Sequence, residues 1–167
     1  MESNMITKRE IQKQMRSLAV PADKEFAGFL DAFDQDELFD RRNFAGHITV
    51  SVAVIHLFDR EILLLHHKAL DRWLLPGGHV DFDDKSIVSA VFREMEEETG
   101  LAASQLILMN EEKGEPYCVG INSHRIPHNP AKNEAEHVHH DFRFIFGYSG
   151  DKNMEIDSYE SFGYKWV

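Results

Sequence analysis

The sequence predicts an α/β fold in which helices flank a mixed β-sheet. Three observations lead to this prediction. Runs rich in β-branched and aromatic residues alternate with helical segments, two of these runs are spaced as a hairpin, and one helix carries an apolar stripe. A chain of 167 residues with 43% hydrophobic residues can bury one sizeable core, so we expect a single domain over residues 1–167.

Two short helices are expected first, over residues 7–18 and 23–32, with Pro21 between them. Their apolar residues, including Phe26, are spaced to cover one side of a domain. We therefore expect residues 1–38 to form a helical N-terminal extension that packs on the domain. A lid over a substrate and a dimer contact are the alternatives.

The sheet and the central helix follow. Residues 47–58 and 61–66 are typical of two strands joined by a short polar turn. A helix is predicted over residues 86–99, because Ser86 can cap its start and Gly100 its end. Further strands are predicted over residues 105–110, 117–123, 139–148 and 159–167.

Three glutamates are the most informative feature of this helix. Residues three and four positions apart share a helix face, so Glu94, Glu97 and Glu98 project together beside the apolar stripe. Their charges crowd the negative end of the helix dipole, and a bound cation would offset that cost. Ligand sets made only of oxygen favour Mg²⁺ or Mn²⁺ over zinc. The pattern therefore indicates a divalent-metal site and phosphate chemistry, with a solvated acidic face as the alternative.

Residues 93–101, R-E-M-E-E-E-T-G-L, follow a glycine turn at residues 75–81, L-P-G-G-H-V-D. Together they resemble the signature of the Nudix hydrolases, G-x5-E-x7-R-E-U-x-E-E-x-G-U, where U is a bulky aliphatic residue. The second half matches at every fixed position, with Met95 in an aliphatic position. In the first half, counted from Gly78, Asp84 takes the place of the glutamate and is followed by one extra residue. Asp84 would then stand in as an outer metal ligand.

The similarity extends to residues 45–51, 122–127 and 137–144, which look like those of a bacterial Nudix subgroup of unsettled substrate. The resemblance implies an α/β/α sandwich of Nudix type. It also implies a further helix after the strand that holds Trp166, so we expect that the chain is truncated or has lost that helix.

The resemblance also implies a role for each residue of the motif. The metal ligands would be the carboxylates of Glu94, Glu97 and Glu98 and the backbone carbonyl of Gly77, with Mg²⁺ or Mn²⁺ as the cofactor. Arg93 would orient the neighbouring glutamates through charge-assisted hydrogen bonds. The implied catalytic set is Arg93, Glu94, Glu97 and Glu98.

The implied reaction is hydrolysis of a nucleoside diphosphate linked to another moiety, written NDP-X, by attack of water on a diphosphate phosphorus. Metal ions would neutralise developing charge and lower the pKa of the attacking water. Glu97, Glu98 or a loop carboxylate such as Glu134 or Glu136 would accept the proton. ADP-ribose, nucleotide sugars, dinucleoside polyphosphates, coenzyme A and oxidised nucleoside triphosphates all stay open as substrates.

Two further groups of residues are candidates for substrate binding. The chain contains 10 histidines, and His137, His139 and Asp141 alternate along an expected strand, which places all three on one face. We interpret them as contacts to substrate phosphate or as further metal ligands; polar strand residues without such a role are the alternative. Trp73 and Tyr117 could stack on a nucleobase, with packing in the core or in a turn as the alternative.

Composition narrows the class of partner. A net charge of −11 disfavours a large nucleic acid, so a small phosphorylated metabolite or nucleotide derivative is expected. Cys118 is the only cysteine, which excludes an internal disulfide and a multi-cysteine zinc site. No apolar run approaches the roughly 18 residues that span a bilayer, and the first residues lack a signal-peptide pattern. We therefore expect a cytoplasmic protein without membrane association, and a homodimer stays open.

Two other classes of protein compete with the enzyme. The altered first half of the motif permits a Nudix-like domain that binds a nucleotide or metabolite as a sensor, without turnover. His137 and His139 also suggest a histidine-metal β-barrel of the cupin type, which would lack the central helix.

Overall fold

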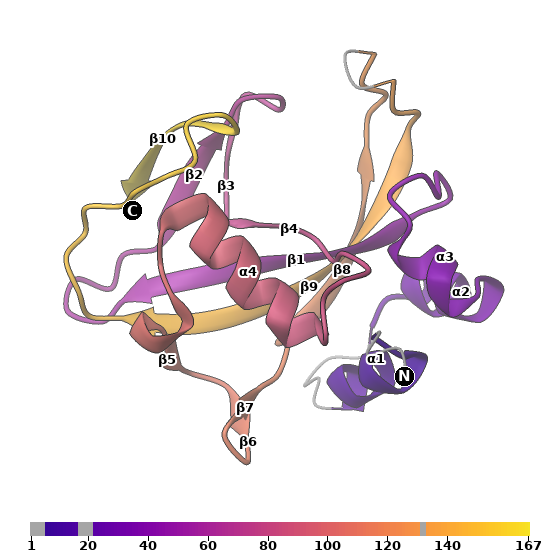
Figure 1. Cartoon of the computed structure of the whole chain (residues 1–167), viewed down its shortest axis with the longest axis horizontal. Helices are drawn as coiled ribbons and strands as arrows, with labels where there is room; N and C mark the ends of the chain where they lie inside the picture. The colour runs from indigo at the N-terminus through magenta and orange to yellow at the C-terminus, as the bar shows by residue number, and fades with distance from the viewer. Residues whose placement is uncertain (1–5, 17–21, 131–132) are drawn as a thin grey trace.

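A central mixed sheet organises the molecule (Figure 1). The computed structural model describes residues 6–16, 22–130 and 133–167. The strands of this sheet are β1 (His47–His56), β4 (Gly77–His79), β5 (Ile107–Leu108), β8 (Gly120–Ile126) and β9 (His137–Tyr148). Strands β1 and β9 run parallel to each other, whereas β4 pairs antiparallel with β1, and β5 and β8 pair antiparallel with β9.

Two smaller sheets complete the β-structure. An antiparallel sheet has the strand order β10 (Ser161–Trp166), β2 (Leu63–His67) and β3 (Arg72–Leu74). A short hairpin pairs β6 (Glu111–Glu112) with β7 (Glu115–Pro116). In Figure 1 the β10-β2-β3 sheet and the N-terminal helices stand at opposite ends of the long strands β1 and β9.

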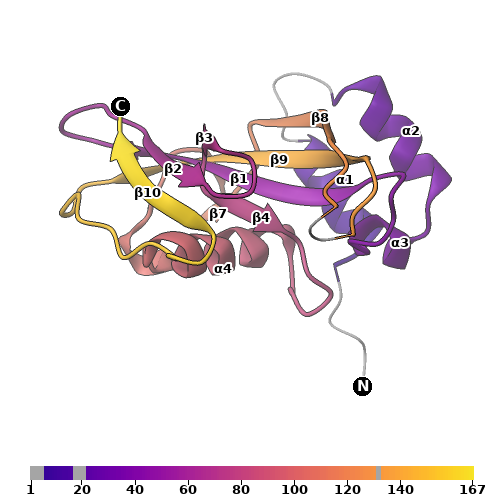
Figure 2. The ribbon, with the colours of Figure 1, turned by 90° about the horizontal axis from the view of Figure 1, so that it is seen from above.

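The four α-helices of the described residues fall into two groups. They are α1 (Lys8–Arg16), α2 (Lys24–Ala32), α3 (Gln35–Phe39) and α4 (Ile87–Thr99). Figures 1 and 2 show α4 along one face of the central sheet and α1 to α3 gathered where β1 begins. Helix α4 is therefore the element that faces the middle of the sheet.

The core follows from the alternation of side chains along the two long strands. Even-numbered residues of β1 and β9 point to the α4 side, where Phe92 of α4 contacts Phe146 at 5.5 Å between ring centroids. Helix α2 extends this core, because the ring of Phe26 meets that of Phe142 edge to face. Fully buried members of the core include Phe26, Val52, Val54, Ile87, Val91, Met95, Phe142 and Phe146. The odd-numbered residues at the start of β1 and β9 lie on the other face.

The structure confirms the α/β class, the mixed sheet and the central helix. Ser86 caps α4 by accepting a hydrogen bond from the N–H of Ser89 at 2.9 Å, and Gly100 ends the helix with φ of 72°. The helix and mixed sheet exclude the cupin-type barrel. Among the described residues, no helix is both long and apolar enough to cross a membrane.

Other elements differ from the prediction. The strand predicted over residues 105–110 is shortened to β5, because a 3₁₀ turn (Ala103–Gln105) precedes it. Helix α3 and the short strands β3 and β4 were not predicted, since segments of three to five residues are too short to show a period. Pro21 lies outside the described residues.

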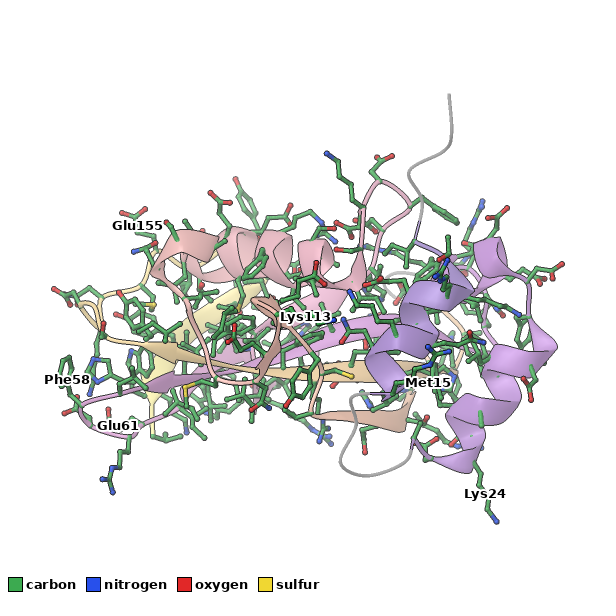
Figure 3. All side chains as sticks on the ribbon, turned by 90° about the horizontal axis from the view of Figure 1, so that it is seen from below. Met15, Lys24, Phe58, Glu61, Lys113 and Glu155 are labelled. Carbon is green, nitrogen blue, oxygen red and sulfur yellow. The ribbon has the colours of Figure 1, made fainter. Side chains whose placement is uncertain are left out.

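Two side chains at the end of the molecule opposite the N-terminal helices illustrate how α4 and the sheet are bounded (Figure 3). Figure 3 shows Glu155 beside the last turns of α4, and a Cβ added to Gly100 would lie 3.2 Å from the Cβ of Glu155. Phe58 projects from the turn after β1 and is 76% exposed. The end of α4 is thus covered by the segment that leads into β10.

Candidate active site

Two glycines of β4 bring the strand against the carboxylates of α4. A Cβ on Gly77 would lie 2.1 Å from the carbonyl oxygen of Val50, and a Cβ on Gly78 would lie 2.5 Å from Oε2 of Glu94. The backbone N–H of Gly77 donates to Oε2 of Glu98 at 2.6 Å. Gly77 leaves no room for a Cβ against the backbone of β1, and a Cβ on Gly78 would displace the carboxylate of Glu94, so the two glycines allow β4 to lie close to β1 and to that carboxylate.

Arg93 gathers the acidic groups around one guanidinium. Its Nε and Nη2 donate to the two carboxylate oxygens of Asp84 at 3.1 and 2.8 Å. Its Nη1 donates to Glu94 at 2.8 Å and to Glu97 at 3.1 Å, and Nη2 also donates to the backbone carbonyl of His79 at 2.8 Å. Hydrogen bonds from Arg93 to Asp84 and Glu94 raise the pKa of the guanidinium. These hydrogen bonds place the guanidinium of Arg93 among the carboxylates, and the role that the resemblance implies for it stays a prediction.

The electrostatics of the site favour a bound cation. Glu94 and Glu98 are each only 7% exposed. The pKa of Glu98 is raised to about 8, chiefly by burial, against the opposing hydrogen bond from Gly77 and with the help of the carboxylates of Glu94, Glu160 and Asp157. Burial also raises the pKa of Glu94 despite its contact with Arg93. Several carboxylates thus share one guanidinium, and a donor set made only of oxygen fits Mg²⁺ or Mn²⁺.

Two of the predicted metal ligands, Glu97 and Asp84, differ in how exposed they are to solvent. The side chain of Glu97 is 61% exposed, so it reaches solvent while it contacts Arg93. Asp84 is 6% exposed, and both of its oxygens accept from Arg93, with Oδ2 also accepting from the N–H of Asp81 at 2.8 Å. This geometry makes Asp84 a partner that positions Arg93, and its role as a metal ligand stays a prediction.

The polar residues predicted on β9 share one face of the sheet, on the side opposite α4. Asp141 accepts from the hydroxyls of Thr49 and Ser51 at 3.3 and 2.6 Å and from Nε of Arg143 at 3.3 Å. This carboxylate is therefore bound to neighbouring strand residues. Its role in substrate binding stays a prediction.

His137 and His139 meet two histidines that the sequence interpretation missed, His47 of β1 and His79 of β4. The pKa of His47 is lowered to about 4 and that of His139 to about 2, chiefly by burial and also by the neighbouring histidines. These rings are therefore neutral at pH 7. Two signals in the sequence could have found them. His47 stands at an odd-numbered position of its strand, as His137 and His139 do in theirs, and His79 directly follows the two glycines.

The remaining candidates lie on other elements. Trp73 is on β3 of the second sheet, where its ring stacks on His66 at 4.8 Å and lies under Nζ of Lys165 at 4.3 Å. Glu136 lies in the connection between β8 and β9 and pairs with Arg125 at 3.0 Å. The structure therefore does not place these two residues on α4 or β4, which carry the acidic site.

Comparison with known proteins decides the family. The NUDIX domain profile matches residues 47–167. The chain belongs to the Nudix family. This match covers the whole region from β1 to β10 and confirms the predicted Nudix hydrolase class, and it leaves the N-terminal helices outside the matched region.

Relatives and solved structures agree with this assignment. A protein of Lactococcus lactis subsp. cremoris described as a probable DHNTP pyrophosphohydrolase is 30% identical over 98 residues, which cover 59% of this chain and 53% of that protein. The Nudix chain thus spans about half the length of this curated relative. A NUDIX family hydrolase from Clostridium perfringens is similar in structure, with a TM-score of 0.53, 25% identity, and coverage of 72% of this chain and 80% of that one.

A more distant structure shows the same fold. The dihydroneopterin triphosphate pyrophosphohydrolase of E. coli has a TM-score of 0.52 with 18% identity, and the match covers 72% of this chain and 79% of that chain. At this identity the similarity shows the fold alone.

Proposed function

We propose that this Nudix protein is a metal-dependent pyrophosphohydrolase that cleaves NDP-X by attack of water on a diphosphate phosphorus. One observation carries the proposal: the arrangement in which Arg93 holds Asp84, Glu94 and Glu97 while Glu98 is bound to the N–H of Gly77. Such a site brings carboxylate oxygens together beside a glycine turn whose backbone carbonyl is also available to a cation.

The residues of the site have separate tasks in this reaction. Glu94, Glu97, Glu98 and the carbonyl of Gly77 would hold the cation. When bound, Mg²⁺ or Mn²⁺ would neutralise charge on the diphosphate and lower the pKa of the attacking water. Arg93 keeps the carboxylates oriented through its five hydrogen bonds.

The proton acceptor is Glu97 or Glu98. Glu97 reaches solvent, with a side chain 61% exposed, and can meet an incoming water. Glu98 is 7% exposed, and burial raises its pKa, which makes its carboxylate a stronger base than an exposed one. The loop carboxylate Glu136 pairs with Arg125 outside α4, which makes it the weaker candidate.

The substrate carries a phosphoanhydride and at least one organic group. NDP-X is our first candidate class, with the polar face around His137, His139 and Asp141 and the ring of Trp73 as proposed substrate contacts. Dihydroneopterin triphosphate is the second candidate, because the Lactococcus lactis relative at 30% identity is described as acting on it. Both substrates require cleavage of the same kind of bond.

The test compares three glutamates of one helix. Wild type, Glu97→Gln, Glu98→Gln and the control Glu96→Gln are incubated with Mg²⁺ and a panel of NDP-X compounds and dihydroneopterin triphosphate in ¹⁸O-labelled water. Mass spectrometry of the products identifies the substrate and the phosphorus that takes up the label. Glu96 is exposed on the helix surface. We expect turnover to fall at least about 100-fold in Glu97→Gln and Glu98→Gln and to be unchanged in Glu96→Gln.

The same experiment separates the enzyme from a sensor. Tight binding of a compound with no product would overturn the hydrolase and favour the Nudix-like sensor. Equal loss of turnover in Glu96→Gln would show that the effect comes from helix charge in general and would overturn the assigned roles.

A further inference from the structure

Four histidines form a cluster on the sheet face opposite α4, and we define this cluster as His47, His79, His137 and His139. In the parallel pairing of β1 with β9, His47 lies directly opposite His139. His79 lies on β4 on the other side of β1, opposite Thr49. The β-sheet register therefore places His47 and His139 side by side, with His79 two residues along from His47 on the same face and His137 two residues from His139 along β9.

The ring nitrogens of this cluster are spaced as metal ligands are. Nε2 of His47 lies 3.1 Å from Nε2 of His79, and Nε2 of His137 lies 3.1 Å from Nε2 of His139. One ligand nitrogen from each of His47, His79 and His139 lies within 4.8 Å of the other two. Two imidazole nitrogens bound to one tetrahedral zinc ion are about 3.3 Å apart. Small side-chain rotations would therefore place all three rings around one ion.

Backbone carbonyls orient two of the rings toward the centre of the cluster. Nδ1 of His137 lies 2.8 Å from the carbonyl oxygen of Ala135, so that nitrogen carries the proton and Nε2 presents its lone pair to the cluster. Nδ1 of His47 faces the carbonyl of Asn43 at 3.5 Å. Histidines that bind metals have this arrangement, with one nitrogen on the ion and the other donating to a carbonyl or carboxylate.

We propose that His47, His79 and His139 bind one transition-metal ion of the Zn²⁺ class through their ring nitrogens, with His137 beside the fourth coordination position. Imidazole nitrogen suits Zn²⁺, Cu²⁺, Ni²⁺ and Fe²⁺, whereas Mg²⁺ and Mn²⁺ prefer oxygen. The histidine cluster and the carboxylates of α4 thus bind different classes of metal. The proposal uses none of the carboxylates proposed to hold Mg²⁺ or Mn²⁺, and it gives His139 a metal ion in place of direct contact with substrate phosphate.

The two sites are linked through β4. His79 contributes its ring to the cluster, and its backbone carbonyl accepts from Nη2 of Arg93 at 2.8 Å. Gly77, which binds Glu98, lies two residues earlier in the same strand. An ion on His79 therefore restrains the strand that presents Gly77 to the acidic helix, and stabilises the native protein because the unfolded chain lacks the site.

The experiment uses the full chain after removal of metals with a chelator. Cobalt is titrated first, because Co²⁺ in a tetrahedral imidazole site absorbs visible light far more strongly than octahedral Co²⁺ bound by oxygen. Zn²⁺ then displaces it in a calorimetric titration. The variants are His79→Asn and His139→Asn. The controls are His66→Asn, whose ring lies on β2 and pairs with Asp71 at 2.9 Å, and Glu98→Gln at the acidic site.

We expect wild type to bind one equivalent of Zn²⁺, with the strong cobalt spectrum and a raised melting temperature. Affinity should fall at least about 10-fold in His79→Asn and His139→Asn and stay unchanged in both controls. A weak octahedral cobalt spectrum in wild type overturns the proposal. Zn²⁺ affinity equal to that of wild type in both variants also overturns it. If a variant fails to fold, the wild-type spectrum decides. Loss of hydrolysis with intact Zn²⁺ binding would sink the proposed function and leave this site standing.

Discussion

Replacement of Arg93 by methionine should remove the one cation that holds the acidic groups of α4 together. The guanidinium side chain is 26% exposed, and its partners Asp84 and Glu94 have side chains only 6% and 9% exposed. Arg93→Met therefore leaves two buried carboxylates without their cation. Methionine keeps much of the side-chain length and packing, so the change isolates the loss of charge and hydrogen bonds.

The expected loss follows from this burial. Removing one partner of a buried ion pair costs about 3–5 kcal/mol in free energy of unfolding. Asp84 keeps its hydrogen bond from the N–H of Asp81, so we expect a value near the lower end, about 3 kcal/mol. For a chain of this size, that corresponds to a melting temperature lower by about 6–12 °C.

Urea unfolding followed by circular dichroism, without added metal, measures this loss in Arg93→Met, Asp84→Asn and the double variant. The cycle should show a coupling free energy of about 2 kcal/mol between Arg93 and Asp84. Arg42→Met is the matched control, because Arg42 pairs with Asp40 at 3.2 Å but has a side chain 87% exposed, and it should leave the midpoint unchanged. A loss in Arg93→Met below about 1 kcal/mol, or additive single variants, would refute the view that Arg93 organises the site.

Three further variants test other parts of the structure. Gly78→Ala places a Cβ 2.5 Å from Oε2 of Glu94 and should displace that carboxylate. We therefore expect kcat to fall at least about 10-fold while the circular dichroism spectrum stays unchanged. A kcat equal to that of wild type would show that hydrolysis does not depend on this position of the Glu94 carboxylate. Ser86→Ala should lower the free energy of unfolding in urea by about 1 kcal/mol, because it removes the cap of α4, and an unchanged midpoint would argue against that cap. Burial raises the pKa of Asp23, but the hydrogen bonds it accepts, from Ser123 among others, outweigh burial and hold its pKa below the ordinary 3.8. The stabilisation from Asp23 is therefore present above pH 3.8 and lost as pH falls below it, because the unfolded chain then binds the proton more readily. Asp23→Asn should remove this part of the acid dependence in urea titrations from neutral to strongly acidic pH, and parallel curves for the two proteins would contradict it.

The central helix was predictable because its determinants are local. Ser86 and Gly100 bound it, and its apolar stripe and its glutamates repeat with the helical period, so neighbours in sequence decide which face packs and which face is acidic. The same locality made the Nudix motif recognisable. The long strands β1 and β9 were predictable for a similar reason, since alternation along a strand is also a short-range pattern.

The position of Asp84 shows what spacing in the sequence does not specify. Counted along the motif, it replaces a glutamate with one residue too many, which suggested an outer metal ligand. In the structure, the turn before α4 places both of its oxygens on Arg93. The direction of a side chain in a turn depends on the path of the backbone, and residue spacing does not specify that path.

By itself, the sequence determined the α/β class, the acidic helix and the family to which this protein belongs, because each rests on patterns among residues that are close together in the chain. Only the tertiary structure decided that His47, His79 and His139 meet. These residues are separated by dozens of positions, and they come together because β1 pairs in parallel with β9 and antiparallel with β4 in one particular register. A register shifted by one residue would send a strand's histidine to the opposite face, so the cluster depends on how the whole sheet pairs.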